Sequence, residues 1–355
     1  MAGSAAARVT AAELVRFIAA CYRAVGIAAA EAERAARLMV QSDLAGADGH
    51  GVFRLPQYIR RIKAKGLNVA PQIRVERNAA GTALVDGDNG LGHLVMEKAA
   101  ETAIAIAAEH GVGWVGVRHG NHAGAASVYA AMPLAHDMIG LYLAIGNANH
   151  LPPWGGIDML LSTNPIAIAV PALEEPPIVL DMATTVAAYG KVKLAAQRGE
   201  RMPEGWMIDR EGKPLTDPAR ADDGFLLPIG GYKGYGLALL FGLLAGTLNG
   251  AAFGREVVDF NKDDETPTNT GQAIIALKIA AFAEPAAFKR AVDNIARQMR
   301  GSRTLPGFDR VRLPGEEMHR RRQEREALGI PMPPPLRAAL NRLAAELGVG
   351  KLGDR

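Results

Sequence analysis

The sequence predicts an α/β protein that combines short buried strands with amphipathic helices. Residues 166–170 and 178–180 are short β-branched apolar runs bounded by proline, a pattern typical of buried strands. Residues 10–26 repeat apolar side chains at helical spacing, and residues 94–110 form a long alanine-rich stretch without helix breakers. A chain of 355 residues can bury a substantial core, and we expect it to divide into two lobes.

Composition excludes several classes of partner. The formal charge of +3 is too small to argue for a nucleic acid or an anionic membrane, and the 5% aromatic content is too low for a base-stacking surface. No apolar run is long enough to span a bilayer, and the first residues lack a secretory core. The single cysteine, Cys21, rules out an internal disulfide and fits a reducing compartment. We therefore expect a cytoplasmic protein.

The first helix carries clear end signals. Thr10 and Glu13 form a capping box, an apolar stripe that includes Cys21 follows, and Gly26 ends the helix. Cys21 is therefore expected in the core rather than as a nucleophile. A second helix is predicted over residues 31–44.

A possible site follows the second helix. Glycines flank His50, and a helix is expected to restart near residue 52 with Pro56 in its first turn. His50, Arg54 and Tyr58 then recur every four residues and share one side. An imidazole, a guanidinium and a phenol on one face could handle a small carboxylic acid. The same residues also fit an ordinary capped surface helix, which residue chemistry alone favours.

The stretch GVGWVG (residues 111–116) matches the dinucleotide-binding pattern G-x-G-x-x-G in form only. Strands are predicted at residues 73–76 and 83–86, a helix at 94–110 and a strand at 114–117. A helix therefore precedes these glycines and a strand follows them, whereas a Rossmann fingerprint needs the reverse order. We reject the Rossmann interpretation.

His119 and His122 come at the turn that follows this strand. Two histidines three residues apart could ligate a metal, but no carboxylate or cysteine stands at suitable local spacing. A single working histidine at a strand end is the better functional interpretation.

The stretch from residue 146 to residue 184 combines buried strands with loops rich in Gly, Pro, Asn and Thr. Such loops often carry binding sites, although a surface loop between core strands fits equally well. Asp181 ends a strand directly before a helix predicted over residues 186–197, a position that favours anions. Lys233 lies in a glycine turn ahead of an apolar helix and could hold a phosphate or ribose, but close packing and a solvated lysine explain this turn as well. A strand at 273–279 and a helix at 285–299 complete the prediction.

Taken together, these motifs resemble the malate/L-sulfolactate/ureidoglycolate dehydrogenase family, which is distinct from the Rossmann lactate dehydrogenases. The resemblance covers nearly the whole chain and rests on motifs in the family's order. They are DGHGVFRLPQY, GVRHGNHAG, PPWGG, STNPIAIAVP, IVLDMATT, MPEGW, GGYKGYGLAL and LPGEE.

The resemblance implies a mixed sheet with a non-Rossmann nucleotide-binding fold, a largely helical second domain and a homodimer. We expect residues 1–80 and 290–355 to form the helical domain. Residues 81–289 would form the α/β region that binds cofactor and substrate. The implied activity is hydride transfer between NAD or NADP and the C2 atom of a small 2-oxo or 2-hydroxy carboxylic acid.

The resemblance also implies roles for individual residues. His50 matches the proposed proton donor or acceptor, and His122 matches a second histidine given that work in some members. Arg54 matches the position that grips the substrate carboxylate through a bidentate pair. Asp181 would orient a histidine or the cofactor. Tyr58 and Thr163 are expected to contact substrate. Cofactor contacts are expected at Ile178, Val179, Leu180, Asp181, Met182, Ala183, Thr184, Tyr232, Lys233, Gly315, Glu316 and Glu317.

The chain departs from the family pattern at several positions. Gly49 replaces a common serine, the usual GTNP begins with Ser162, and DMATS reads DMATT. Relatives tend to carry T-N-S where this chain has Ala148-Asn149-His150, and His150 is expected to reshape the substrate pocket.

Three other functions stay open. One is reduction of a cyclic imino acid such as Δ1-piperideine-2-carboxylate. Another is a metal-dependent hydrolase or lyase built on His119, His122 and His150. The third is a non-catalytic binding protein. The choice between NAD and NADP is open too.

Overall fold

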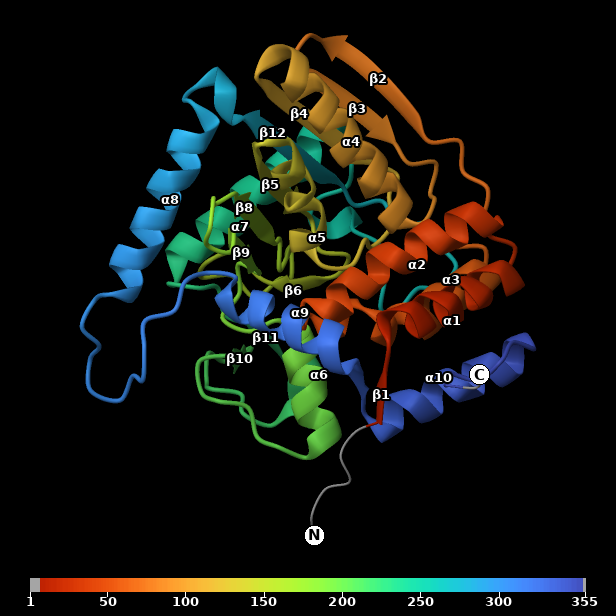
Figure 1. Cartoon of the computed structure of the whole chain (residues 1–355). Helices are drawn as coiled ribbons and strands as arrows, with labels where there is room; N and C mark the ends of the chain where they lie inside the picture. Colours follow the sequence, from red (N-terminus) through yellow and green to blue (C-terminus); the bar gives the residue numbers. More distant parts are fainter. Residues whose placement is uncertain (1–6, 354–355) are drawn as a thin grey trace.

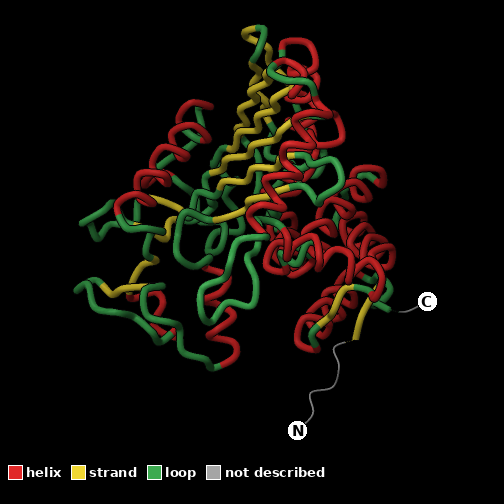
Figure 2. Tube along the Cα trace, turned by 60° about the vertical axis from the view of Figure 1, so that its left-hand side comes forward, coloured by secondary structure: helices red, strands yellow, loops and turns green. Residues whose placement is uncertain are grey.

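A seven-stranded mixed sheet forms the centre of the protein in a computed structural model that describes residues 7–353, apart from the side chains at positions 197 and 198 (Figures 1 and 2). Strands β3 and β4 run parallel, and the remaining neighbours in the sheet run antiparallel. In spatial order the strands are β2 (Arg74–Ala79), β3 (Thr82–Asp86), β4 (Val112–Arg118), β12 (Gln272–Lys278), β5 (Met138–Ala144), β8 (Ile166–Val170) and β9 (Ile178–Met182). The predicted α/β class with a mixed sheet is confirmed.

Helices cover both faces of this sheet because strand side chains alternate between the two faces. In β5, Tyr142 and Ala144 join the core under α4 (Gly92–His110) and α5 (Ala126–Ala130). Leu141 and Leu143 point the other way and pack with α7 (Tyr232–Ala245). The functional segments are therefore held by strands that are buried from two sides.

Close packing explains the glycines of the GVGWVG stretch. A Cβ atom on Gly113 would lie 2.2 Å from the carbonyl oxygen of Ala103 in α4, so only glycine lets this helix approach β4. Strand β4 follows α4, as predicted. Gly113 therefore serves helix-on-sheet packing, and Gly116 leaves room for the side chain of Asn249.

A second core lies in the helical part, seen at the lower right of Figure 1. The N-terminal strand β1 (Ala7–Val9) pairs there with β13 (Ile330–Met332), which ties the start of the described chain to the segment ahead of α10 (Pro334–Leu347). The capping box of Thr10 and Glu13 is confirmed, and Cys21 is buried as expected. The helices of this part are α1 (Ala11–Ala24), α2 (Ala29–Leu44), α3 (Leu55–Lys63) and α10.

The remaining elements surround the sheet (Figure 1). They are β6 (Asn149–Leu151), β7 (Leu161–Ser162), α6 (Tyr189–Arg198), β10 (Met207–Asp209), β11 (Gly224–Leu226), α8 (Pro285–Arg300) and α9 (Glu316–Leu328). In residues 7–353, no helix is both long enough and apolar enough to cross a bilayer. The division into residues 1–80 with 290–355 and residues 81–289 stays a prediction.

Candidate active site

The chain that carries His50 is not one continuous helix. Two single turns of 3-10 helix, Asp48–His50 and Val52–Arg54, precede α3. They are separated at Gly51, where a Cβ atom would lie 2.1 Å from the carboxylate of Asp43. Asp43 is buried and accepts a 2.9 Å hydrogen bond from the N–H of Val52. This buried carboxyl group therefore shapes the turn that presents His50.

Two histidines from distant parts of the chain stack on each other. The rings of His50 and His122 have centroids 5.5 Å apart and an interplanar angle of 10°. Phe260 also stacks on His122, at 5.4 Å and 18°. Burial lowers the pKa of both histidines, and the charge of Arg54 lowers it further. Both imidazoles are therefore neutral bases near neutral pH.

Tyr58 orients His122. Its buried phenolic oxygen lies 2.5 Å from Nδ1 of His122, and the N–H of Gly124 points at the same nitrogen from 3.4 Å. Both contacts use Nδ1, so Nε2 is the nitrogen of His122 available to a substrate. A base whose second nitrogen is held by a fixed partner is the arrangement that proton transfer requires.

His93 is a third histidine of this cluster, and no local sequence pattern marks it. It lies in α4, with its ring edge-on to that of Tyr58 at 5.5 Å and 84°. Burial lowers its pKa to about 4, and neither ring nitrogen has a hydrogen-bond partner among the described residues. Its place in the helical stretch GHLVMEKAA is typical of an ordinary core position, so only the fold reveals it.

Arg54 lies beside the histidine pair and keeps N–H groups available to bind a ligand. Its Nε donates to the carbonyl oxygen of Gly49 at 3.0 Å, and its Nη1 donates to Gln57 at 2.8 Å. It makes no ion pair within the described part of the chain. The charge of Arg54 acts on both His50 and His122. A guanidinium in this state is suited to a substrate carboxylate.

Asp181 and Thr163 lie at the sheet end of the site. The carboxylate of Asp181 in β9 accepts a 2.9 Å hydrogen bond from the N–H of Ser127, and its charge raises the pKa of His50. No hydrogen bond joins Asp181 to a histidine among the described residues. Thr163 accepts hydrogen bonds from the N–H and hydroxyl of Thr184 through its carbonyl oxygen. The sequence-predicted residues His50, Arg54, Tyr58, His122 and Asp181 therefore belong to one neighbourhood.

The three segments assigned to the cofactor by resemblance converge on β9. The N–H of Val179 in this strand donates to the carbonyl of Pro314 at 3.1 Å. The N–H of Ile229, at the start of the α7 glycine turn, donates to the carbonyl of Thr184 at 3.0 Å. Residues 178–184, 230–233 and 315–317 are thereby brought together, although they are far apart in sequence.

These residues fit a dinucleotide. Helix α7 begins at Gly231 without a side-chain cap, so its first N–H groups are available to a phosphate, and Lys233 is exposed in its first turn. Tyr232 is 61% exposed and offers an aromatic face. A Cβ atom on Gly315 would lie 2.8 Å from the carbonyl oxygen of Val179, so the turn needs glycine to approach β9.

The two acidic residues of the same turn differ in their partners. Glu316 accepts a 3.0 Å hydrogen bond from the N–H of Leu313. Glu317 pairs with Arg320 and Arg321, and these hydrogen bonds lower its pKa to about 2.

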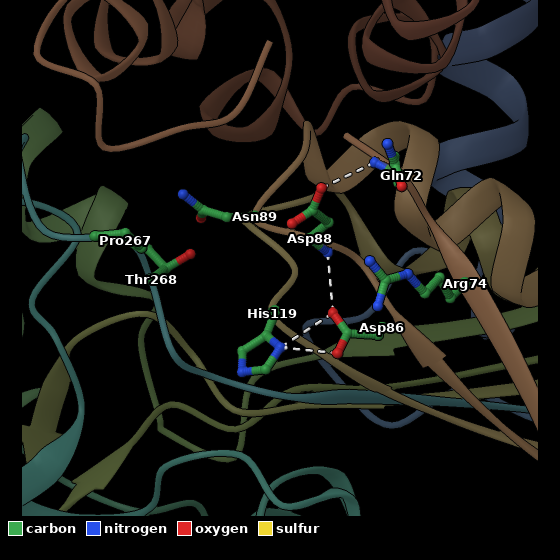
Figure 3. A pocket seen from close by; sticks show the side chains of 8 residues that line it. All are labelled: Gln72, Arg74, Asp86, Asp88, Asn89, His119, Pro267 and Thr268. Carbon is green, nitrogen blue, oxygen red and sulfur yellow. Dashed lines mark hydrogen bonds and ion pairs between the residues drawn. The ribbon is translucent and has the colours of Figure 1, made fainter. Parts of the chain in front are cut away.

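The three histidines of the metal-site hypothesis lie in different groups. His119 pairs with Asp86 at 3.0 Å and lines a separate surface cavity of about 220 Å³ (Figure 3). His122 belongs to the pair with His50, and His150 stacks on Tyr189 at 4.0 Å. Within residues 7–353 no three His, Cys, Asp or Glu side chains gather as a ligand set. The geometry gives this hypothesis no support.

The chain is similar to known dehydrogenases over most of its length. The chain is 37% identical over 324 residues to the L-sulfolactate dehydrogenase of Methanocaldococcus jannaschii, covering 91% of this chain and 92% of that protein. It is 36% identical over 345 residues to the malate dehydrogenase of Pyrococcus horikoshii, covering 95% and 94%. Other relatives are named as an NAD(+)-dependent ureidoglycolate dehydrogenase and an NADP(+)-dependent (2R)-3-sulfolactate dehydrogenase.

Solved structures share the whole fold. The sulfolactate dehydrogenase of M. jannaschii superposes with a TM-score of 0.89 at 35% identity, covering 97% of this chain and 98% of that chain. The Δ1-piperideine-2-carboxylate reductase of Pseudomonas syringae superposes with a TM-score of 0.84 at 28% identity, covering 95% and 100%.

A family model described as malate/L-lactate dehydrogenase matches residues 9–341. The resemblance inferred from the motifs is confirmed, and the chain belongs to the malate/L-lactate dehydrogenase family.

Proposed function

We propose that the protein is an NAD- or NADP-dependent dehydrogenase that interconverts a small 2-oxo acid and its 2-hydroxy acid. The observation that carries this proposal is the stacked, neutral pair His50 and His122 beside the Arg54 guanidinium, with Tyr58 holding Nδ1 of His122. It supplies a proton-transferring group next to an anion-binding group. Oxidation of a 2-hydroxy acid requires both groups: one to take the hydroxyl proton and one to bind the carboxylate.

Arg54 binds the substrate carboxylate. Gln57 and the carbonyl of Gly49 hold the guanidinium, so it meets the carboxylate with its orientation already set. A bidentate pair then fixes which face of C2 is exposed and holds the C2 oxygen close to the histidine pair.

His122 moves the proton at the C2 oxygen. For oxidation, the neutral imidazole takes the hydroxyl proton on Nε2, and the Tyr58 hydroxyl accepts a hydrogen bond from Nδ1–H. For reduction, the protonated ring returns that proton to the C2 oxygen. We assign this step to His122 because the Tyr58 hydroxyl holds its Nδ1, whereas Nδ1 of His50 has no partner among the described residues. His50 stacks on the His122 ring and helps to bury it.

The segments around β9 hold the cofactor. Residues 178–184, Tyr232, Lys233 and 315–317 would contact it, with the α7 N-terminus at a phosphate. When bound, the nicotinamide supplies or accepts the hydride at C2. The hydrogen bonds that Thr184 donates to the carbonyl oxygen of Thr163 support a place for Thr163 beside the cofactor segment, where it would contact the substrate.

A panel assay tests this proposal. Purified protein is mixed with NADH or NADPH and with pyruvate, oxaloacetate, sulfopyruvate, 2,3-diketogulonate or piperideine-2-carboxylate, and loss of the reduced-nicotinamide absorbance is followed. We expect turnover of at least one 2-oxo acid. Absence of both turnover and nucleotide-dependent thermal stabilisation would refute the proposal.

Reduction of a cyclic imino acid is the second candidate. It is supported by the full-length structural likeness to a Δ1-piperideine-2-carboxylate reductase. An imino acid offers the same carboxylate to Arg54 and a nitrogen instead of an oxygen to His122. Turnover of piperideine-2-carboxylate without turnover of any 2-oxo acid would favour it.

We also propose a homodimer located in the cytoplasm. After Lys233, helix α7 is apolar on all sides, yet several of its leucines face solvent in the single chain, which supports burial against a second copy. The exposed leucines here and in the following turn are Leu237, Leu240, Leu243, Leu244 and Leu248. The single, buried Cys21 is consistent with a reducing compartment. Sedimentation velocity of the purified protein tests the oligomeric state.

A further inference from the structure

A second cation lies at the edge of the active site. Lys193 is half-buried in α6, where its Nζ donates a 3.3 Å hydrogen bond to Oδ1 of Asn261. The same ammonium lies over the ring of Tyr189, 5.4 Å from the centroid. None of the ion pairs within the described residues includes Lys193, so its charge is not neutralised by direct contact.

A short chain of contacts connects this lysine to the catalytic groups. Asn261 directly follows Phe260, the residue whose ring stacks on His122. The carbonyl oxygen of Phe260 accepts a 2.8 Å hydrogen bond from Gln57, and Gln57 accepts one of 2.8 Å from Arg54. One loop therefore carries the partner of Lys193, packs on His122 and is tied to Arg54 through Gln57.

The two cations act on each other electrostatically. Burial lowers the pKa of Lys193, and the charge of Arg54 lowers it further, while Asp259 and Asp222 offset part of the effect. Neither cation has an ion-pair partner in the part of the chain that the structure describes. Two unpaired like charges at one site are unfavourable, and a ligand with an acidic group at each end would relieve them.

Resting on the dehydrogenase function proposed above, we infer that Lys193 binds a second acidic group of the substrate. Arg54 binds the carboxylate next to the reacting carbon, and Lys193 binds a carboxylate or sulfonate at the other end. The substrate class is therefore a 2-oxo or 2-hydroxy acid with two acidic groups.

His150 and Tyr189 form the wall beside this lysine. Their rings stack at a centroid distance of 4.0 Å and an angle of 11°, so His150 fixes the aromatic face under the ammonium. Burial lowers the pKa of His150 to about 4, which keeps it neutral near neutral pH. The cations that act on His150 are Lys193 and Lys262, and of the two only Lys193 is half-buried beside the Tyr189 ring.

The test compares substrates that differ only in the second acid. Oxaloacetate and sulfopyruvate carry it, and 2-oxobutyrate has the carbon-chain length of oxaloacetate without it. Lys193→Met removes the charge, and Lys193→Arg restores it. Lys191→Met is the matched control, because Lys191 is exposed on the same helix and its ammonium lies over the ring of Trp206 at 6.0 Å.

The wild-type enzyme is expected to prefer the diacids. Lys193→Met should lower kcat/KM for oxaloacetate or sulfopyruvate by about 10- to 100-fold, the loss typical of one charge-assisted hydrogen bond. Activity on 2-oxobutyrate should stay unchanged, Lys193→Arg should recover much of the diacid activity, and Lys191→Met should behave like wild type. The diacid with the larger loss identifies the preferred acidic group.

Other outcomes overturn the inference. Equal losses on 2-oxobutyrate and the diacids would mean that Lys193 only supports the fold. Efficient wild-type turnover of 2-oxobutyrate, with no diacid preference, would reject a second anion site while leaving the dehydrogenase function standing. No turnover of any 2-oxo acid would reject the proposed function and the inference together.

Discussion

The phenolic oxygen of Tyr58 lies 2.5 Å from Nδ1 of His122, inside a cluster where the tyrosine is fully buried. Burial raises the pKa of Tyr58, so the phenol stays neutral and acts as a hydrogen-bonding group. By accepting a hydrogen bond from Nδ1–H, the hydroxyl favours the tautomer of His122 whose Nε2 can take the proton. Tyr58 is thereby a positioning residue for the proton-transferring group.

Tyr58→Phe should lower kcat by about 10- to 100-fold and leave KM and cofactor affinity nearly unchanged. The change removes the partner of Nδ1 and leaves the ring free to reorient. Steady-state kinetics with a fluorescence titration of NADH would measure both effects. Tyr22→Phe is the control, because Tyr22 is also fully buried but its hydroxyl has no partner in the described chain. Equal losses in the two variants would show that only stability was affected.

Replacing His122 should cost more than replacing His50. His122→Asn is expected to lower turnover by roughly 10²- to 10⁴-fold, the usual contribution of a general acid or base. His50→Ala should also reduce turnover while nucleotide binding survives. Kinetics and NADH titration of both variants would rank them. The reverse order would move the proton transfer to His50, and joint loss of turnover and nucleotide binding in His50→Ala would indicate a structural role.

Arg54→Lys should mainly raise the substrate KM, by about tenfold or more, because a point charge cannot replace the bidentate fork. Saturation curves with the best 2-oxo acid of the panel would show it. Arg60→Lys is a suitable control, since Arg60 lies on the solvent side of α3 and pairs with Asp264. An unchanged KM for Arg54→Lys would remove this residue from the substrate site.

Asp43 should make the protein less stable at higher pH. Burial raises its pKa from 3.8 to about 8, so the folded state keeps the proton to a much higher pH than the unfolded chain. The contribution of this raised pKa to the free energy of unfolding is fully present below pH 3.8 and is lost as the pH rises toward about 8. In Asp43→Asn, the decrease in unfolding free energy between pH 5 and pH 8 should be smaller by on the order of a few kcal/mol. Urea melts at pH 5 and pH 8 would measure it; parallel slopes in both proteins would contradict the argument.

Gly315→Ala should weaken cofactor binding by about tenfold or more. The added Cβ would meet the backbone of Val179, and the φ of +85° already disfavours any side chain. Gly307→Ala carries the same conformational strain at φ +90° but meets open space. Isothermal titration of NADH and NADPH into both variants separates the two effects. Similar affinities in the two variants would show that the approach of this turn to β9 is irrelevant to the cofactor.

Local features of the fold were predictable from the sequence, because they depend on neighbours along the chain. The capping box at Thr10, strand β8 and strand β12 follow from short patterns, and β8 matches its predicted bounds. Strand β5 (Met138–Ala144) was missed, since its run MIGLYLA is buried on both faces and shows no alternation. Its partner β12 is more than a hundred residues away and cannot be identified from local pattern.

The candidate site divides in the same way. His50, Arg54 and Tyr58 share a short segment, so their grouping was foreseeable, although α3 begins at Leu55 rather than near residue 52 and two 3-10 turns precede it. His93 and Lys193 lie on helices with no local motif around them. Only the packing of α4 behind Tyr58, and of α6 beside Asn261, brings them to the site.

The position of β12 between β4 and β5 affects how the protein folds during its synthesis on the ribosome. Strands β4 and β5 are separated by a gap that only residues 272–278 fill. When β4 and β5 have both been synthesised, the nascent chain still lacks β12, the strand that joins the two halves of the sheet. The exposed edges must wait for more than a hundred further residues to be synthesised. We therefore expect the nascent chain to be prone to aggregation during this interval, and truncation before β12 removes the strand that pairs with both β4 and β5.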